Sequence, residues 1–224
     1  MIPDSADPIV AHYDSLGAAH SLLGSSVGVE YAVAGGRAQN YQHGRIYFSA
    51  GTGAYSVHGA ILTHYLQLAG PAGVLGFPVS DERAVGSTGR ANAFAGADRD
   101  GGAILFTART GAYSVHGEIL RDYLKLGGPA NVLGYPTSDE LASPDRTGRG
   151  NTFTGGVMLW TPRLGAHEVH GAILVRYAQL KFESGPLGYP VTDEYAVTGG
   201  RRSGFVHGTI VYKLATRTTT VTLD

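Results

Sequence analysis

Histidine and aspartate recur in this sequence at one fixed separation. Each Val-His-Gly triplet is followed, 23 residues after its histidine, by an aspartate, and the pairs are His58 with Asp81, His116 with Asp139, and His170 with Asp193. An imidazole and a carboxylate can orient each other and offer a hydrogen-bond donor and acceptors. Tyr55 and Tyr113 precede two of these histidines and could stack on the face of a sugar ring. Sugar hydroxyls require directional hydrogen bonds beside such a face, so we predict that these eight residues bind carbohydrate.

The pattern has two explanations. In a ring of repeats, the fourth site would carry Thr222 at the histidine position and Val29 at the aspartate position, so both partners are lost together. One explanation is that the chain ends relax the local structure. The other is that the histidine and aspartate form a polar site, which this junction no longer maintains. The two can meet only if the chain doubles back between them, and about three equivalent weak sites would then exist per chain.

Catalytic and metal-binding patterns are weak. Gly24-Ser25-Ser26-Val27-Gly28 matches a serine-hydrolase pattern, but it needs a strand, a sharp turn and a helix around the serine. Here it falls inside a degenerate copy of a repeated turn, which favours coincidence. The chain has nine histidines and no cysteine, and the histidines lack the short spacing of metal ligands on one helix. We therefore expect no catalytic residue, no metal and no cofactor.

Composition excludes further classes of protein. The 224 residues include 34 glycines, and 17 basic residues balance 18 acidic ones, for a net charge of −1. No basic face that could hold a nucleic-acid backbone is indicated, and no apolar stretch approaches the roughly 20 residues that span a bilayer. No signal peptide is visible at the N-terminus, so a cytoplasmic location is compatible with the sequence.

The candidate residues belong to a repeat. Leu-Gly-aromatic-Pro followed by Ser/Thr-Asp-Glu begins at Leu75, Leu133 and Leu187, and a degenerate copy begins at Leu23. The intervals between these leucines are 52, 58 and 54 residues. In all four copies a Glu is followed by the Arg of a Gly-Arg pair after 7, 8, 9 and 7 residues. A fixed separation of opposite charges predicts an internal ion pair, with ligand contact as the alternative. Length varies in only two segments of the repeat, which indicates loops.

Each unit is predicted to contain a short helix and a few short strands. Ile61, Leu62, Tyr65 and Leu68 form one apolar stripe at helical spacing, and the first helix is predicted to have Asp7 as its N-cap and Pro8 at its first position. Residues 46–48 and 54–57 predict a hairpin.

One such unit has too small a core to fold alone, so the units must stack. We predict one domain of four units, at about 1–57, 58–115, 116–169 and 170–224. The chain begins at a helix and ends at the strand type that precedes the other helices, so its ends match in register. This favours a mainly β repeat protein with short helices, closed into a propeller-like ring with approximate four-fold symmetry. An open superhelix is the alternative.

The repeated Leu-Gly-Phe/Tyr-Pro element with Ser/Thr-Asp-Glu, at a period of about 54 residues, resembles the LGFP-repeat family over essentially the whole chain. That resemblance implies an extracellular or cell-wall location, because these repeats accompany secreted actinobacterial cell-envelope enzymes and are thought to hold them to wall polysaccharide. No catalytic domain accompanies the repeats in this chain.

Three functions follow as hypotheses. The first is a non-catalytic, lectin-like carbohydrate-binding or cell-wall-anchoring protein, with a glycan or wall polysaccharide as partner and several weak sites that together provide avidity. The second is a structural or protein-interaction scaffold. The third is a cell-wall hydrolase using the repeated Asp-Glu pair. Adjacent residues of an extended segment point to opposite sides, which argues against two glycosidase carboxylates. The oligomeric state and the sugar are left open.

Overall fold

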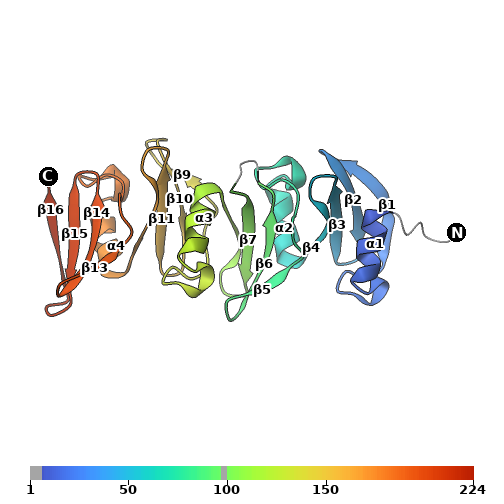
Figure 1. Cartoon of the computed structure of the whole chain (residues 1–224), viewed down its shortest axis with the longest axis horizontal. Helices are drawn as coiled ribbons and strands as arrows, with labels where there is room; N and C mark the ends of the chain where they lie inside the picture. Colours follow the sequence, from blue (N-terminus) through green and yellow to red (C-terminus); the bar gives the residue numbers. More distant parts are fainter. Residues whose placement is uncertain (1–6, 97–99) are drawn as a thin grey trace. The chain divides into compact units, whose positions relative to one another are not determined.

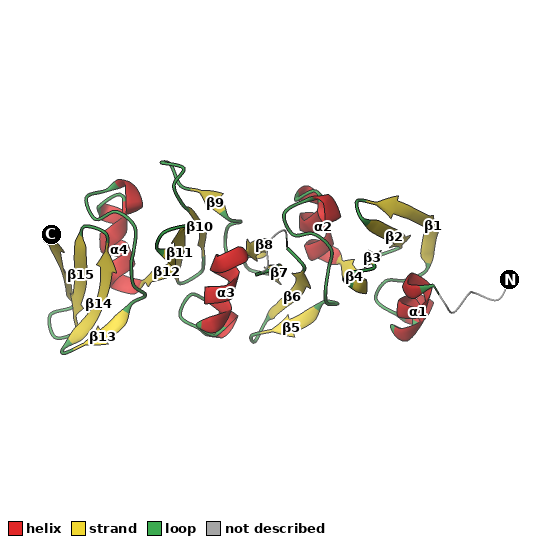
Figure 2. Cartoon of the chain, turned by 45° about the horizontal axis from the view of Figure 1, so that its top comes forward, coloured by secondary structure: helices red, strands yellow, loops and turns green. Residues whose placement is uncertain are grey.

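The computed structural model describes residues 7–96 and 100–224, and it divides into two compact units, Met1–Gly117 and Glu118–Asp224. In the described residues, each repeat has a short α-helix, a 3-10 turn (η) and a four-stranded antiparallel sheet (Figure 1). Figure 2 shows the four sheets and their helices by type. The mainly β repeat architecture with short helices is therefore confirmed. Closure into a ring and the single-domain assignment stay predictions.

In every sheet the strands are hydrogen-bonded in chain order. The elements of repeat 1 are α1 (Pro8–Ser15), η1 (Ala18–His20), β1 (Ser26–Val33), β2 (Gly36–Tyr41), β3 (Gly44–Ser49) and β4 (Gly53–His58). Those of repeat 2 are α2 (Gly59–Gln67), η2 (Gly70–Ala72), β5 (Arg83–Val85), β6 (Gly89–Phe94), β7 (Gly102–Thr107) and β8 (Gly111–His116).

The second unit repeats this order. Repeat 3 contains α3 (Gly117–Lys125), η3 (Gly128–Ala130), β9 (Leu141–Ala142), β10 (Arg149–Thr152), β11 (Gly156–Thr161) and β12 (Gly165–His170). Repeat 4 contains α4 (Gly171–Gln179), η4 (Phe182–Ser184), β13 (Tyr195–Val197), β14 (Gly200–Phe205), β15 (Gly208–Lys213) and β16 (Thr218–Leu223).

Within each unit, a helix packs between two successive sheets. Helix α2 contacts β3 and β4 of repeat 1 and β7 and β8 of repeat 2, and α4 is placed in the same way in unit 2. The predicted apolar stripe lies on the buried face of α2: Ile61 and Tyr65 are fully buried, while Leu62 and Leu68 pack at the edge of the core. Because α2 and α4 each fill the space between two sheets, the two repeats of each unit share one core.

The helix tyrosine fixes the turn of its own repeat. In all four repeats its hydroxyl donates to the carbonyl of the glycine in the Leu-Gly pair, at 2.7 Å for Tyr13 to Gly24, 2.5 Å for Tyr65 to Gly76, 2.6 Å for Tyr123 to Gly134 and 2.8 Å for Tyr177 to Gly188. These four glycines have φ between 62° and 71°, a left-handed conformation that a side chain disfavours. The Leu-Gly pair and the tyrosine are therefore two parts of one turn.

The aromatic residue of the Leu-Gly-aromatic-Pro turn packs against the preceding repeat. A Cβ placed on Gly36 would lie 2.8 Å from the Phe77 ring, and one on Gly148 would lie 2.7 Å from the Tyr189 ring. Both glycines belong to the Gly-Arg pairs of the sequence pattern. Glycine is thus required where the sheet of one repeat meets the aromatic ring of the next repeat within a unit.

The predicted Glu-Arg ion pairs form in all four repeats. Arg90 Nε lies 3.8 Å from Glu82 Oε1, and the other pairs are Arg37 with Glu30, Arg149 with Glu140, and Arg201 with Glu194. Asp7 also takes its predicted place, because its carboxylate accepts hydrogen bonds from the N–H groups of Ile9 and Val10 at the start of α1. The same carboxylate accepts a hydrogen bond from Arg37, which links the helix cap to the first ion pair.

Candidate functional site

A small pocket in unit 1 brings together two of the predicted site residues, His58 and Asp81. It has a volume of about 150 Å³ and is lined by Ser56 and His58 of β4, by Asp81 and Glu82 after the repeat 2 turn, and by Leu16, Ser21, Leu22 and Leu23 of repeat 1. The chain does double back along α2, as the pairing of His58 with Asp81 required. Polar side chains and leucines therefore line the same pocket.

His58 and Asp81 share the pocket without binding each other. The His58 Nδ1 atom lies 3.6 Å from Glu82 Oε2, and Glu82 also pairs with Arg90 on the neighbouring sheet. The prediction that His58 and Asp81 contact each other directly, made from their 23-residue spacing, is therefore wrong. The glutamate one position later takes that place, because its side chain, and not that of Asp81, turns toward the end of β4.

Asp81 stabilises the edge of the first sheet. Its Oδ1 atom accepts hydrogen bonds from the Ser56 backbone N–H at 2.8 Å and the Ser56 hydroxyl at 2.7 Å, and the Nε2 atom of His12 lies 2.9 Å away. Ser56 belongs to the outer strand β4, whose unpaired N–H groups need partners. Burial opposes ionisation of this carboxyl, but the hydrogen bonds from His12 and Ser56 bring the net pKa of Asp81 below its usual value.

The equivalent residues of unit 2 repeat this arrangement with changes. Asp193 accepts a hydrogen bond from the Glu168 backbone N–H on β12 at 3.1 Å, and His167 Nδ1 lies 3.4 Å from the same oxygen. His170 lies between two carboxylates, with Nδ1 2.7 Å from Glu168 and Nε2 3.4 Å from Glu194. The hydrogen bond to Glu168 raises the pKa of His170, although burial opposes the shift. Here too, the histidine contacts glutamates and not the predicted aspartate.

The two predicted tyrosines lie beside the helices of their repeats. Tyr55 is half-buried, with its ring 6.0 Å from the His12 ring in an edge-to-face contact, and it does not line the pocket that holds His58. Tyr113 makes the same contact with His64 at 6.1 Å. His116 and Asp139 belong to different units, so their pairing stays a prediction.

The pocket offers hydrogen-bonding groups and apolar side chains. Asp81 and Glu82 do line the same pocket, contrary to the expectation that neighbouring residues point apart. In a glycosidase pair the carboxyl group that donates the proton has a raised pKa, and the lowered pKa of Asp81 does not fit that role. Ser26 begins strand β1 and is exposed, so the turn-to-helix context of a serine nucleophile is missing there.

Sequence reasoning missed the roles of four residues around these histidines and aspartates. Glu82 and Glu194 were not recognised as histidine partners, and Ser56 carried no signal of its own. His12 is remote in sequence from Asp81 and belongs to the preceding helix. A search for the residue two positions before each Val-His-Gly histidine would have found Ser56 and Glu168, since both face the aspartate across the sheet edge.

Comparison with known families settles the classification. A model described as the LGFP repeat matches residues 23–73, 75–131, 133–185 and 187–224. The chain belongs to the LGFP-repeat family. No curated protein matches it. Over residues 7–96 and 100–224, no helix is long and apolar enough to cross a membrane, and no three His, Cys, Asp or Glu side chains are grouped to hold a metal ion.

Proposed function

We propose that this LGFP-repeat protein is a non-catalytic carbohydrate-binding or cell-wall polysaccharide-anchoring protein with several weak sites per chain. The observation that carries the proposal is the unit 1 pocket, which is lined by Ser56, His58, Asp81 and Glu82 together with three leucines. Donors and acceptors beside an apolar surface suit a sugar ring. The volume of about 150 Å³ admits part of a sugar unit and not a whole oligosaccharide, which suits weak, repeated contacts along a polymer.

The scaffold function has its own support. Asp81 and Glu82 already have protein partners in the sheet edge, in His58 and in Arg90. A protein in which these residues serve only to join repeats needs no ligand. Binding measurements separate the two functions.

The test is a glycan array of bacterial wall polysaccharide fragments, followed by calorimetric titration of the fragment that binds best. Because Asp81 holds the sheet edge, His58→Ala and His170→Ala are better variants than changes at the aspartates. We expect the double variant to lower the number of bound fragments per chain, with His43→Ala as the control because His43 is exposed and outside the pocket. Absence of any bound glycan, or unchanged binding in the double variant, would leave the scaffold function.

The arrangement of the four repeats bears on how many sites one polymer can reach. Asp81 accepts a hydrogen bond from the backbone N–H of Ser56, and Asp193 accepts one from that of Glu168. In a closed ring, Val29 would occupy the equivalent position at the fourth junction. Valine cannot accept a hydrogen bond, so this contact would be lost at the closing junction. We therefore favour the open superhelix, in which the sites follow one another along the chain, over the closed ring.

A further inference from the structure

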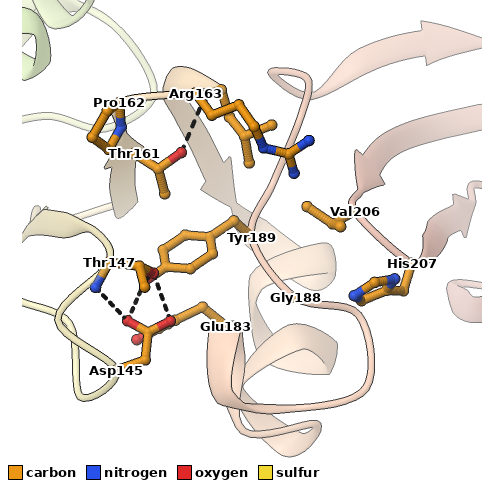
Figure 3. A pocket seen from close by; sticks show the side chains of 11 residues that line it. Asp145, Thr147, Thr161, Pro162, Arg163, Glu183, Gly188, Tyr189, Val206 and His207 are labelled. Carbon is orange, nitrogen blue, oxygen red and sulfur yellow. Dashed lines mark hydrogen bonds between the residues drawn. The ribbon is translucent and has the colours of Figure 1, made fainter.

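Unit 2 contains a larger cleft that the repeated histidines and aspartates do not form. It has a volume of about 470 Å³, within the range of pockets that hold small molecules. Figure 3 shows its lining: the β9–β10 loop, the β11–β12 hairpin and η4 surround the Tyr189 turn, and the β14–β15 hairpin closes one side. All of these segments belong to repeats 3 and 4.

One wall of the cleft is fixed by a hydrogen-bond network. The Tyr189 hydroxyl donates to Asp145 Oδ1 at 2.8 Å, and the Thr147 hydroxyl donates to Asp145 Oδ2 at 2.7 Å. The Thr147 backbone N–H donates to Oδ1 as well, at 3.0 Å. These hydrogen bonds lower the pKa of Asp145, and the two from Thr147 have the largest effect. Asp145 is therefore occupied by the protein and orients Tyr189, so it is not a free ligand-binding group.

The other ionisable side chains that line the cleft are Arg163, His207 and Glu183. Arg163 and His207 are exposed at the ends of hairpins. Within the described part of the chain, no acidic side chain pairs with Arg163 or His207, and no basic one pairs with Glu183. In Figure 3 the Arg163 guanidinium lies on the opposite side of the Tyr189 ring from Asp145. The cleft thus offers a cation, an imidazole and a carboxylate acceptor beside the apolar surfaces of Pro162, Leu164 and Val206.

The junction of repeats 1 and 2 lacks these groups. At the equivalent positions of unit 1, Gly51 stands for Arg163, Pro71 for Glu183 and Phe77 for Tyr189. The loop that supplies Asp145 and Thr147 is two residues longer than its counterpart in repeat 1, counted from Glu to Arg. Loop length, the tyrosine hydroxyl and the charges therefore all differ between the two junctions. The close contact of the glycine with the aromatic ring is the same, with Gly36 against Phe77 and Gly148 against Tyr189.

From this cleft we propose that unit 2 binds a saccharide unit that carries a carboxylate, an inference that rests on the proposed carbohydrate-binding function. Arg163 binds the carboxylate, since a guanidinium forms paired hydrogen bonds with two oxygens, and His207 faces the same opening. Glu183 accepts from sugar hydroxyls, which a simple inorganic anion does not have. Pro162, Leu164 and Val206 pack against the sugar ring.

The experiment follows backbone amide signals by NMR while glucuronic acid, glucose or acetate is added to the full chain. We expect glucuronic acid to shift signals around Leu164, Tyr189 and His207 and to bind about tenfold more tightly than glucose, a difference of about 1.4 kcal/mol. Arg163→Gln should remove that advantage and leave glucose binding unchanged. Lys213→Gln is the matched control, because it removes one positive charge from an exposed residue of the same unit that does not line the cleft.

Two results would overturn the inference. In the first, glucose and glucuronic acid bind equally and Arg163→Gln changes neither. In the second, acetate binds as tightly as glucuronic acid, which identifies a site for simple anions. Both results leave the unit 1 pocket untouched, since that site is tested with His58→Ala. Conversely, the histidine substitutions can leave glycan binding unchanged while Arg163→Gln still removes the preference for glucuronic acid. That result would contradict the repeated sites and not the cleft of unit 2.

Discussion

His170 lies between Glu168 and Glu194, and the hydrogen bond to Glu168 raises its pKa above the ordinary 6.5. A raised pKa means that the folded state holds the proton more tightly than the unfolded state does. The resulting stabilisation is fully present below about pH 6.5. It is lost as pH rises through the higher pKa of the folded state.

We therefore predict that unit 2 becomes less stable as pH rises from about 6 to 8, and that His170→Gln removes this part of the pH dependence. The proton signals of the His170 ring, followed by NMR, report the pKa directly. Glu168→Gln should lower that pKa, whereas Glu183→Gln, a change to a carboxylate that makes no contact with His170, should not. An unchanged His170 pKa in Glu168→Gln would contradict the prediction.

Some residue roles were predictable from the sequence, and others were not. Asp7 as a helix cap and the four Glu-Arg pairs depend on short, fixed separations, which local geometry determines. The partners of Asp81 depend on how the chain doubles back along α2. A shift of one position in the turn exchanges Asp81 for Glu82 as the neighbour of His58, and spacing alone cannot decide between them.

Elements of the repeat follow from two kinds of pattern. The helices were predictable because their apolar stripe has helical period, and β3 with β4 because a hairpin sequence joins them. Strands β5 and β9 have three and two residues, too few for an alternating pattern to appear. They form because the Glu-Arg pairs and the neighbouring strands hold them in place.

Gly36 shows how closely two repeats approach. A Cβ at this position would lie 2.1 Å from the Phe48 carbonyl oxygen and 2.8 Å from the Phe77 ring. We predict that Gly36→Ala destabilises unit 1 by at least about 2 kcal/mol, because the backbone contact cannot yield without displacing the turn. Urea denaturation followed by circular dichroism measures the change.

Gly51→Ala is the control for that experiment. A Cβ on Gly51 meets no atom within 4 Å, so the expected change is within about 0.5 kcal/mol. Equal effects of the two substitutions would mean that the contact between Gly36 and Phe77 does not hold the repeats together.

At the scale of the whole molecule, the sequence predicted four repeats correctly. Within each unit a helix packs between two successive sheets, because one repeat cannot bury its own core. The sequence did not determine whether the repeats form a closed ring or an open superhelix. In a closed ring, Val29 and Thr222 would stand where the other junctions have an aspartate and a histidine. The local contacts of Asp81 and Asp193 are the physical reason to favour an open series of repeats.

Deletion of residues 195–224 distinguishes the two arrangements. The deletion removes β15 and β16, which pack against α4, and it removes Phe205, whose ring lies 4.6 Å from that of the buried Tyr177. In an open series each repeat depends on its neighbours alone, so we predict damage confined to unit 2. The amide NMR spectrum of unit 1 should match that of the full chain, with intact signals for β1 to β8. In a closed ring, helix α1 would lose a neighbouring repeat as well. Broad changes in the signals of α1 and β1 would therefore reject the open superhelix and restore the ring.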